Sequence, residues 1–121
     1  VRDKPQFIKR TRDKMWLCNL DSLGEILDAY KFTAEKYIED DGSVTLSLNE
    51  IDLVENASTE AEAKNLLAQS IMEYAEEYYN NFSYYNAAPN RKKHVPYIFK
   101  ALIMDDIMKI GECIECHDGK N

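Results

Sequence analysis

The 121-residue sequence lacks the features on which several protein classes depend. No run of apolar residues approaches the roughly 20 residues that a membrane-spanning helix needs, and no charged-then-apolar leader opens the chain. The three cysteines are odd in number and widely separated, so they do not form the disulfide framework of a small secreted domain. We therefore expect a soluble, cytoplasmic protein with no membrane partner.

Residues that carry catalysis are also scarce. The chain has only two histidines and four glycines, and the glycines do not form a phosphate-binding loop. His94 lies in a basic segment and His117 lies near the C-terminus, while no serine has a neighbouring base motif. We predict that the protein is not an enzyme and that it has no catalytic residues.

One short string could hold a cofactor. Cys113-Ile114-Glu115-Cys116-His117 matches the c-type haem attachment sequence, and its sulfur and nitrogen atoms with Cys18 make a zinc ligand set. However, only four residues follow the string, and neighbouring Cys116 and His117 rarely both bind one tetrahedral ion. We predict no cofactor and no metal, and interpret the terminal cysteines as small, partly buried residues. A haem or metal protein is the least favoured alternative.

Charge is distributed unevenly along the chain. The formal net charge is −7, yet residues 1–14 carry six basic and two acidic side chains, so this segment is +4 and the remainder is −11. Such segregation indicates two surfaces with different partners: a basic one that meets phosphate and an acidic one that meets a basic protein. A solvated surface with no partner is the alternative.

The first 31 residues predict a basic unit, a hairpin over residues 6–20 followed by a short helix. Ser22 and Glu25 have the spacing of a helix capping box. A row of basic residues at the hairpin turn could neutralise nucleic-acid phosphates, or could discourage aggregation through the strand edges. These residues are Lys9, Arg10, Arg12 and Lys14.

The string "KPQFIKRTRDKMWLCNLDSLGEIL", within residues 4–30, resembles the second half of the DNA-binding domain of Phd/YefM-type antitoxins. That family shows a strand ending in basic residues, a short turn, a hydrophobic strand and a helix with a Ser/Asp-rich cap. The resemblance implies a dimer that grips operator DNA and regulates transcription. It also implies that Lys9, Arg10, Arg12 and Lys14 contact phosphates.

Residues 32–48 alternate between apolar and polar and predict a second hairpin. A three-residue loop at Asp40–Gly42, with the glycine left-handed, pairs Ile38 with Val44. A two-residue loop would instead place apolar residues opposite polar ones along the whole ladder. We predict the three-residue loop, followed by a third strand at 51–56.

A long amphipathic helix is expected at about 60–80, with Thr59 and Glu62 at capping-box spacing. Its polar stripe consists of Glu62, Asn65, Gln69, Glu73, Glu76 and Asn80. Its apolar stripe consists of Ala63, Leu67, Ile71, Tyr74, Tyr78 and Phe82. Three strands followed by "ASTEAEAKNLLAQSIMEYAEEYY" resemble HicB-type antitoxins, in which a short antiparallel sheet precedes a similarly capped helix. That resemblance implies a role in blocking a nuclease.

The helix ends in an aromatic cluster: Tyr74, Tyr78, Tyr79, Phe82, Tyr84 and Tyr85. The cluster predicts either a protein-binding surface or a core that closes the helix against the sheet. A loop at 86–90 and a basic patch at 91–93 follow. Pro96 suits the first turn of a helix ending near Met104, and Asp106 suits the start of a last helix.

We therefore predict an α+β fold: a small antiparallel sheet packed against the helix at about 60–80, with a helical C-terminal segment at about 96–116. Residues 1–31 and 32–121 are expected to form two units. The predicted function is a type II antitoxin that neutralises a small basic toxin, a ribonuclease, through an acidic hairpin–helix surface and contributes to operator binding. The predicted toxin-binding residues are Glu62, Glu73, Glu76, Glu77, Tyr84 and Tyr85. The alternative is a sequence-independent nucleic-acid-binding protein that also uses the 91–93 patch.

Overall fold

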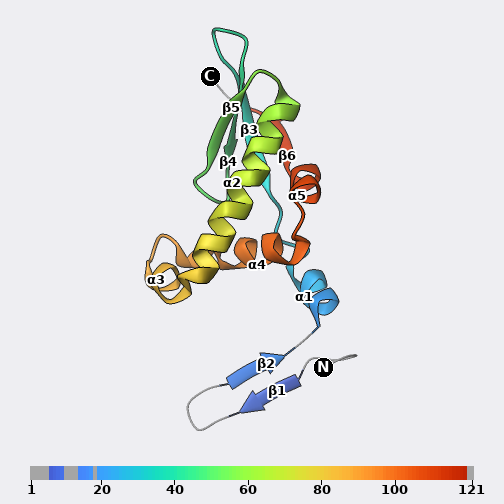
Figure 1. The fold of residues 1–121 in the computed structure, drawn as a ribbon, viewed down its shortest axis with the longest axis vertical. Coiled ribbons are helices and arrows are strands. Elements are labelled where there is room, and N and C mark those ends of the chain that lie inside the picture. The colour runs from blue at the N-terminus through green and yellow to red at the C-terminus, as the bar shows by residue number, and fades with distance from the viewer. Residues whose placement is uncertain (1–5, 10–13, 18, 120–121) are drawn as a thin grey trace.

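The computed structural model describes residues 6–9, 14–17 and 19–119, and it has the predicted α+β fold (Figure 1). A two-stranded and a four-stranded sheet are combined with five α-helices in this part of the chain. The elements are β1 (Gln6–Lys9), β2 (Lys14–Leu17), α1 (Leu20–Leu27), β3 (Thr33–Ile38), β4 (Val44–Leu48), β5 (Val54–Ala57), α2 (Glu60–Asn80), α3 (Phe82–Ala87), the 3-10 helix η1 (Lys92–His94), α4 (Val95–Met104), α5 (Ile107–Cys113) and β6 (Glu115–Asp118).

The β3–β4 hairpin has the predicted loop and register. Ile38 lies opposite Val44, and Gly42 has a φ of 86°, a conformation that glycine adopts without steric cost. The amide of Gly42 donates to the carbonyl oxygen of Glu39 at 2.9 Å. The prediction of a three-residue loop is therefore confirmed.

The four-stranded sheet, in the order β5-β4-β3-β6, is mixed rather than wholly antiparallel. β6 pairs in parallel with β3, so that Thr33 lies opposite Glu115 and Ala34 lies opposite Cys116. The prediction of helix as far as residue 116 is wrong beyond Cys113, where α5 ends. Local composition does not show β6, because this strand forms by pairing with residues far earlier in the chain.

The long helix α2 matches its prediction closely and packs along the sheet (Figure 1). The Thr59 side chain caps its first turn by accepting a hydrogen bond from the Glu62 amide at 3.2 Å. Its buried stripe includes Leu67 and Tyr78, neither of which has exposed surface. Each such apolar side chain stabilises the fold by roughly 1.5–3 kcal/mol through burial, so α2 is the centre of the core.

Helix α1 begins earlier than predicted. Asn19 is its N-cap, and its Oδ1 accepts a hydrogen bond from the amide of Ser22 at 2.7 Å. The predictions of a strand to residue 20 and of a cap at Ser22 are therefore wrong. Asparagine is as good an N-cap as serine, and here it stops the extended chain three residues sooner.

The β1–β2 hairpin forms its own two-stranded sheet and lies beyond α1, away from the larger sheet (Figure 1). In its register Lys9, the last residue of β1, lies opposite Lys14, the first residue of β2. Helix α1 instead packs against α4, close to an edge-on contact between the rings of Tyr30 and Tyr97 at 5.6 Å. The division into units 1–31 and 32–121 stays a prediction.

The C-terminal helices largely follow expectation. Pro96 lies in the first turn of α4, and the Asp106 side chain caps α5 by accepting a bond from the Met108 amide at 2.9 Å. The loop predicted from residue 86 starts only at Ala88, because α3 extends to Ala87. Among the described residues, no helix combines the length and hydropathy that crossing a membrane requires.

Candidate partner-binding surfaces

The exposed side of α2 carries an acidic face formed by Glu73, Glu76 and Glu77. All three side chains are exposed, because the opposite side of the helix is buried against the sheet and α4. Within residues 19–119, none of them forms an ion pair. The α2 acidic face is therefore an uncompensated negative surface that suits a basic partner.

Glu62 lies apart from this face. It is in the first turn of α2, and at a rise of 1.5 Å per residue it is about 22 Å from Glu77 along the helix axis. The structure thus does not bring all the predicted toxin-binding residues together. Tyr84, which is 74% exposed in α3, lies at the other end of α2.

The aromatic cluster is divided between core and surface. Tyr78 has no exposed surface and its hydroxyl donates to the carbonyl oxygen of Arg91 at 2.9 Å. The ring of Tyr85 stacks on that of Tyr78, with centroids 5.2 Å apart. Tyr79 and Tyr84 are mostly exposed. Tyr78 therefore belongs to the core, while the exposed tyrosines are available to a partner.

Arg91 and His94 extend the cluster in a way that sequence reasoning missed. The Arg91 guanidinium lies 5.4 Å from the ring centre of Tyr74 and 5.5 Å from that of Tyr85. Its Nη1 donates to the Tyr74 hydroxyl at 3.1 Å, and that hydroxyl also bonds Nδ1 of His94 at 2.8 Å. The predicted basic patch is thus split, because Arg91 packs inward while Lys92 and its neighbour Lys93 are exposed.

His94 lines a small cavity of about 200 Å³ with Asp52, Tyr74 and Arg91. Its ring is only 2% exposed, and this burial lowers the pKa of His94, although the Asp52 carboxylate acts in the opposite direction. Burial also raises the pKa of Tyr78. The cluster therefore contains a neutral histidine, and its role in this geometry is to tie α2 to η1.

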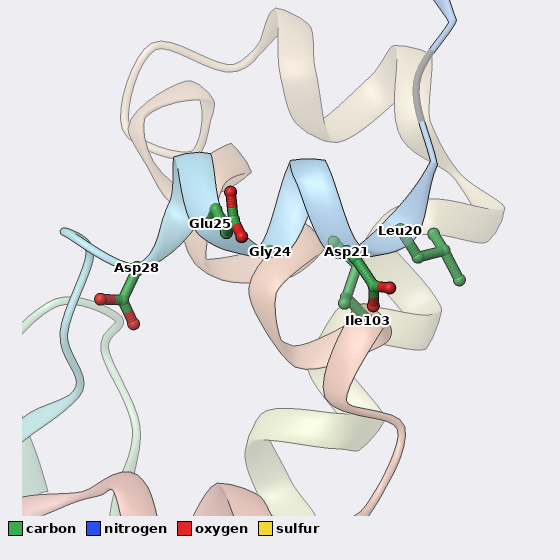
Figure 2. Close-up of a pocket in the computed structure, with 6 residues that line it drawn as sticks. All are labelled: Leu20, Asp21, Gly24, Glu25, Asp28 and Ile103. Carbon is green, nitrogen blue, oxygen red and sulfur yellow. The ribbon is translucent and has the colours of Figure 1, made fainter. Parts of the chain in front are cut away.

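A second acidic surface lies at α1 (Figure 2). A hollow of about 600 Å³ is lined by one side of α1 and by Ile103 of α4. The α1 residues that line it are Leu20, Asp21, Gly24, Glu25 and Asp28. The sequence predictions above do not include this surface, although the spacing of its three carboxylates, by four and then three residues, is visible in the sequence.

The basic hairpin is described only in its strands. Lys9 and Lys14 are opposite each other in the backbone register of the two strands. Arg10 and Arg12, the other two predicted phosphate contacts, lie outside the described residues. The backbone therefore places two of the four basic residues at one end of a hairpin.

The terminal cysteines lie on different elements. Cys113 ends α5 and Cys116 lies in β6; both are partly buried free thiols. Burial raises the pKa of Cys116, which favours the unreactive thiol form. In the part of the chain that the structure describes, no group of three or more His, Cys, Asp or Glu side chains could hold a metal ion. Cys18 lies outside that part.

Two comparisons with known proteins each match an antitoxin. Residues 1–116 match the model of the PHD-like family, described as the antitoxin of toxin–antitoxin systems of the RelE/RelB kind. A crystal structure from Syntrophomonas wolfei subsp. wolfei, described as the antitoxin part of a proposed toxin/antitoxin system, is 35% identical. It superposes with a TM-score of 0.91, over 98% of this chain and 86% of that one. We found no match among curated proteins.

The matched family and the solved relative are both described as antitoxins, which confirms the prediction that the chain is not an enzyme. The family match covers nearly the whole chain and includes both the β1–β2 hairpin and the helix α2. The chain belongs to the PHD-like family of antitoxins of toxin–antitoxin systems.

Proposed function

We propose that this antitoxin neutralises a small basic toxin, a ribonuclease, by covering its RNA-binding site with the α2 acidic face. The tip of the β3–β4 hairpin takes no part in this proposal, because it lies beyond the other end of α2 (Figure 1). The observation that carries the proposal is the row of three exposed glutamates without ion pairs in residues 19–119. A site that binds RNA must attract phosphate, and carboxylates on a rigid helix can imitate that charge.

The exposed tyrosines beside these glutamates support the same surface. Tyr84 and Tyr79 are 74% and 58% exposed, and tyrosine offers a large contact area with few rotatable bonds. Tyr85 packs on Tyr78 beneath them and positions α3. Glu62 is proposed as a separate contact, because it lies at the far end of α2.

The test is whether a small basic protein is encoded beside this chain and co-purifies with it. We expect a stable complex in which the partner no longer cleaves RNA. Absence of a complex, or a complex that still cleaves RNA at full rate, contradicts the proposal.

We propose in addition that the β1–β2 hairpin contacts operator DNA as part of a cytoplasmic homodimer. Lys9 and Lys14 lie opposite each other in the register of the two strands, and the sequence places Arg10 and Arg12 between them. Four neutralised phosphates per hairpin predict that DNA binding weakens steeply as the salt concentration is raised.

The test of DNA binding is whether the antitoxin retards the promoter fragment and random duplex DNA in a gel. Preference for the promoter supports operator recognition, whereas equal retardation supports the alternative of sequence-independent binding.

A further inference from the structure

The seam between α1 and α4 holds two adjoining hollows. The larger, of about 600 Å³, is the acidic one shown in Figure 2. The smaller, of about 180 Å³, has an apolar wall that includes Leu27 and Met104. Gly24, Asp28 and Ile103 line both hollows. Because they share these lining residues, we name the two hollows together the α1 groove.

The rim of the α1 groove is negatively charged. Asp21, Glu25 and Asp28 recur at helical spacing, and Figure 2 shows their carboxylates spread along α1. Among the ion pairs found in residues 19–119, only one involves this rim: Nζ of Lys31 is 3.8 Å from Asp28, and both side chains are exposed. Such an exposed pair at that distance compensates little charge.

The groove also exposes apolar surface. Leu20 stands at one end and is 65% exposed, and of the α1 side chains only Leu27 is buried. The apolar side of an amphipathic surface helix normally faces the core, whereas α1 leaves much of that side exposed. Lys100 lines the smaller hollow, and its Nζ donates to the carbonyl oxygen of Tyr30 at 2.5 Å.

We propose that the α1 groove docks a basic, amphipathic segment of the toxin, an inference that rests on the proposed function. Charge complementarity selects the occupant: Lys and Arg side chains have apolar stems that cover Leu20 and Ile103, and cationic heads that reach the carboxylate rim. This contact is separate from the α2 acidic face. The toxin is therefore held at two places, one of them next to the hairpin proposed to meet DNA.

Gly24 offers a direct test. A Cβ atom added at Gly24 meets no atom within 4 Å apart from its chain neighbours and the backbone of its own helix. Because Gly24 lines both hollows, we expect a larger side chain there to occupy the groove, and a circular dichroism spectrum like that of the wild type checks that the variant is folded. We expect Gly24→Trp to weaken binding of the purified neighbour-encoded toxin by about tenfold or more in a calorimetric titration. Gly24→Ala is the matched control, because it makes the same change in the backbone and fills almost none of the groove. Equal binding by both variants overturns the inference and leaves the proposed function standing.

Charge is tested with two variants that each remove three carboxylates. The groove variant is D21N/E25Q/D28N, and the control is E39Q/D40N/D41N at the tip of the β3–β4 hairpin, at the opposite end of the molecule (Figure 1). The amide that replaces the Asp41 carboxylate keeps a side-chain oxygen to accept from the Ser43 amide. We expect about tenfold weaker binding for the groove variant alone, with the difference shrinking at high salt.

Two further outcomes overturn the inference. Failure of the unaltered antitoxin to bind the toxin overturns the proposed function and this inference together. If Gly24→Trp changes the oligomeric state of the antitoxin alone in light scattering, a second copy of the chain occupies the groove instead.

Discussion

The hydroxyl of Tyr74 lies 2.8 Å from Nδ1 of His94, and this bond joins the middle of the long helix α2 to the turn before α4. His94 is the one buried charged or strongly polar side chain among the described residues. It lies between Arg91 in its own turn and Asp52 across a small cavity. We therefore expect the stability of this end of the molecule to depend on pH.

The free energy of unfolding is expected to decrease as the pH is lowered, because His94 binds a proton less readily in the folded protein than in the unfolded chain. Burial lowers the pKa of His94 in the folded protein, while the unfolded chain has the ordinary value of about 6.5. Below that value the unfolded state binds more protons, so stability is full above about pH 6.5 and decreases as pH falls toward the lowered folded pKa. The loss of stability is measured by the midpoints of urea unfolding at neutral and at acid pH, for the wild type and for His94→Gln. The variant should lose part of the pH dependence, and His117→Gln, exposed in β6, should keep it. An unchanged pH dependence in His94→Gln contradicts the assignment.

Arg91 is expected to stabilise the fold through its planar guanidinium rather than its charge. It lies over the rings of Tyr74 and Tyr85 and donates to the Tyr74 hydroxyl. Arg91→Lys keeps the charge but loses this geometry, and we expect a loss of roughly 0.5–1 kcal/mol. Thermal melts compare Arg91→Lys with Lys92→Ala. Lys92 is an exposed neighbour, so the variant Lys92→Ala should melt like the wild type. Equal melting of Arg91→Lys and wild type contradicts the prediction.

Two glycine-to-alanine changes are expected to have opposite signs. Gly42 has a φ of 86°, where an alanine costs about 1–2 kcal/mol. Gly24 lies in helix α1 with open space around it, and alanine there should stabilise by up to about 1 kcal/mol. Chemical denaturation of the two variants gives the comparison. Destabilisation by both, or by neither, would show that one of the two backbone conformations is wrong.

We expect Leu67 to contribute much more to the stability of the core than its neighbour Leu66. Leu67 has no exposed surface, whereas Leu66 is 38% exposed on the same helix. Leu67→Ala should cost about 2–5 kcal/mol because it leaves a cavity, while Leu66→Ala should cost well under half as much. The unfolding free energies of the two variants check which side of α2 faces the core. Similar costs would contradict the packing of α2.

The sequence could predict what depends on neighbours along the chain. The alternation that pairs Ile38 with Val44 and the cap at Thr59 are local, and both were confirmed. β6 was missed because Cys116 becomes a strand residue only by pairing with Ala34. The α1 groove was missed for the same reason: Ile103 of α4 completes it. Charge spacing indicated acidic faces, but tertiary packing decided which glutamates share a surface.

Inhibition of the toxin's RNA cleavage by the variant E73Q/E76Q/E77Q tests the central claim most directly. The three changes keep the shape of the α2 acidic face and remove its charge, and the matched control is again E39Q/D40N/D41N. We predict that the α2 variant requires at least about tenfold more antitoxin for half-inhibition at low salt, and that the control inhibits like the wild type. Equal inhibition by the α2 variant, the control and the wild type would contradict the account.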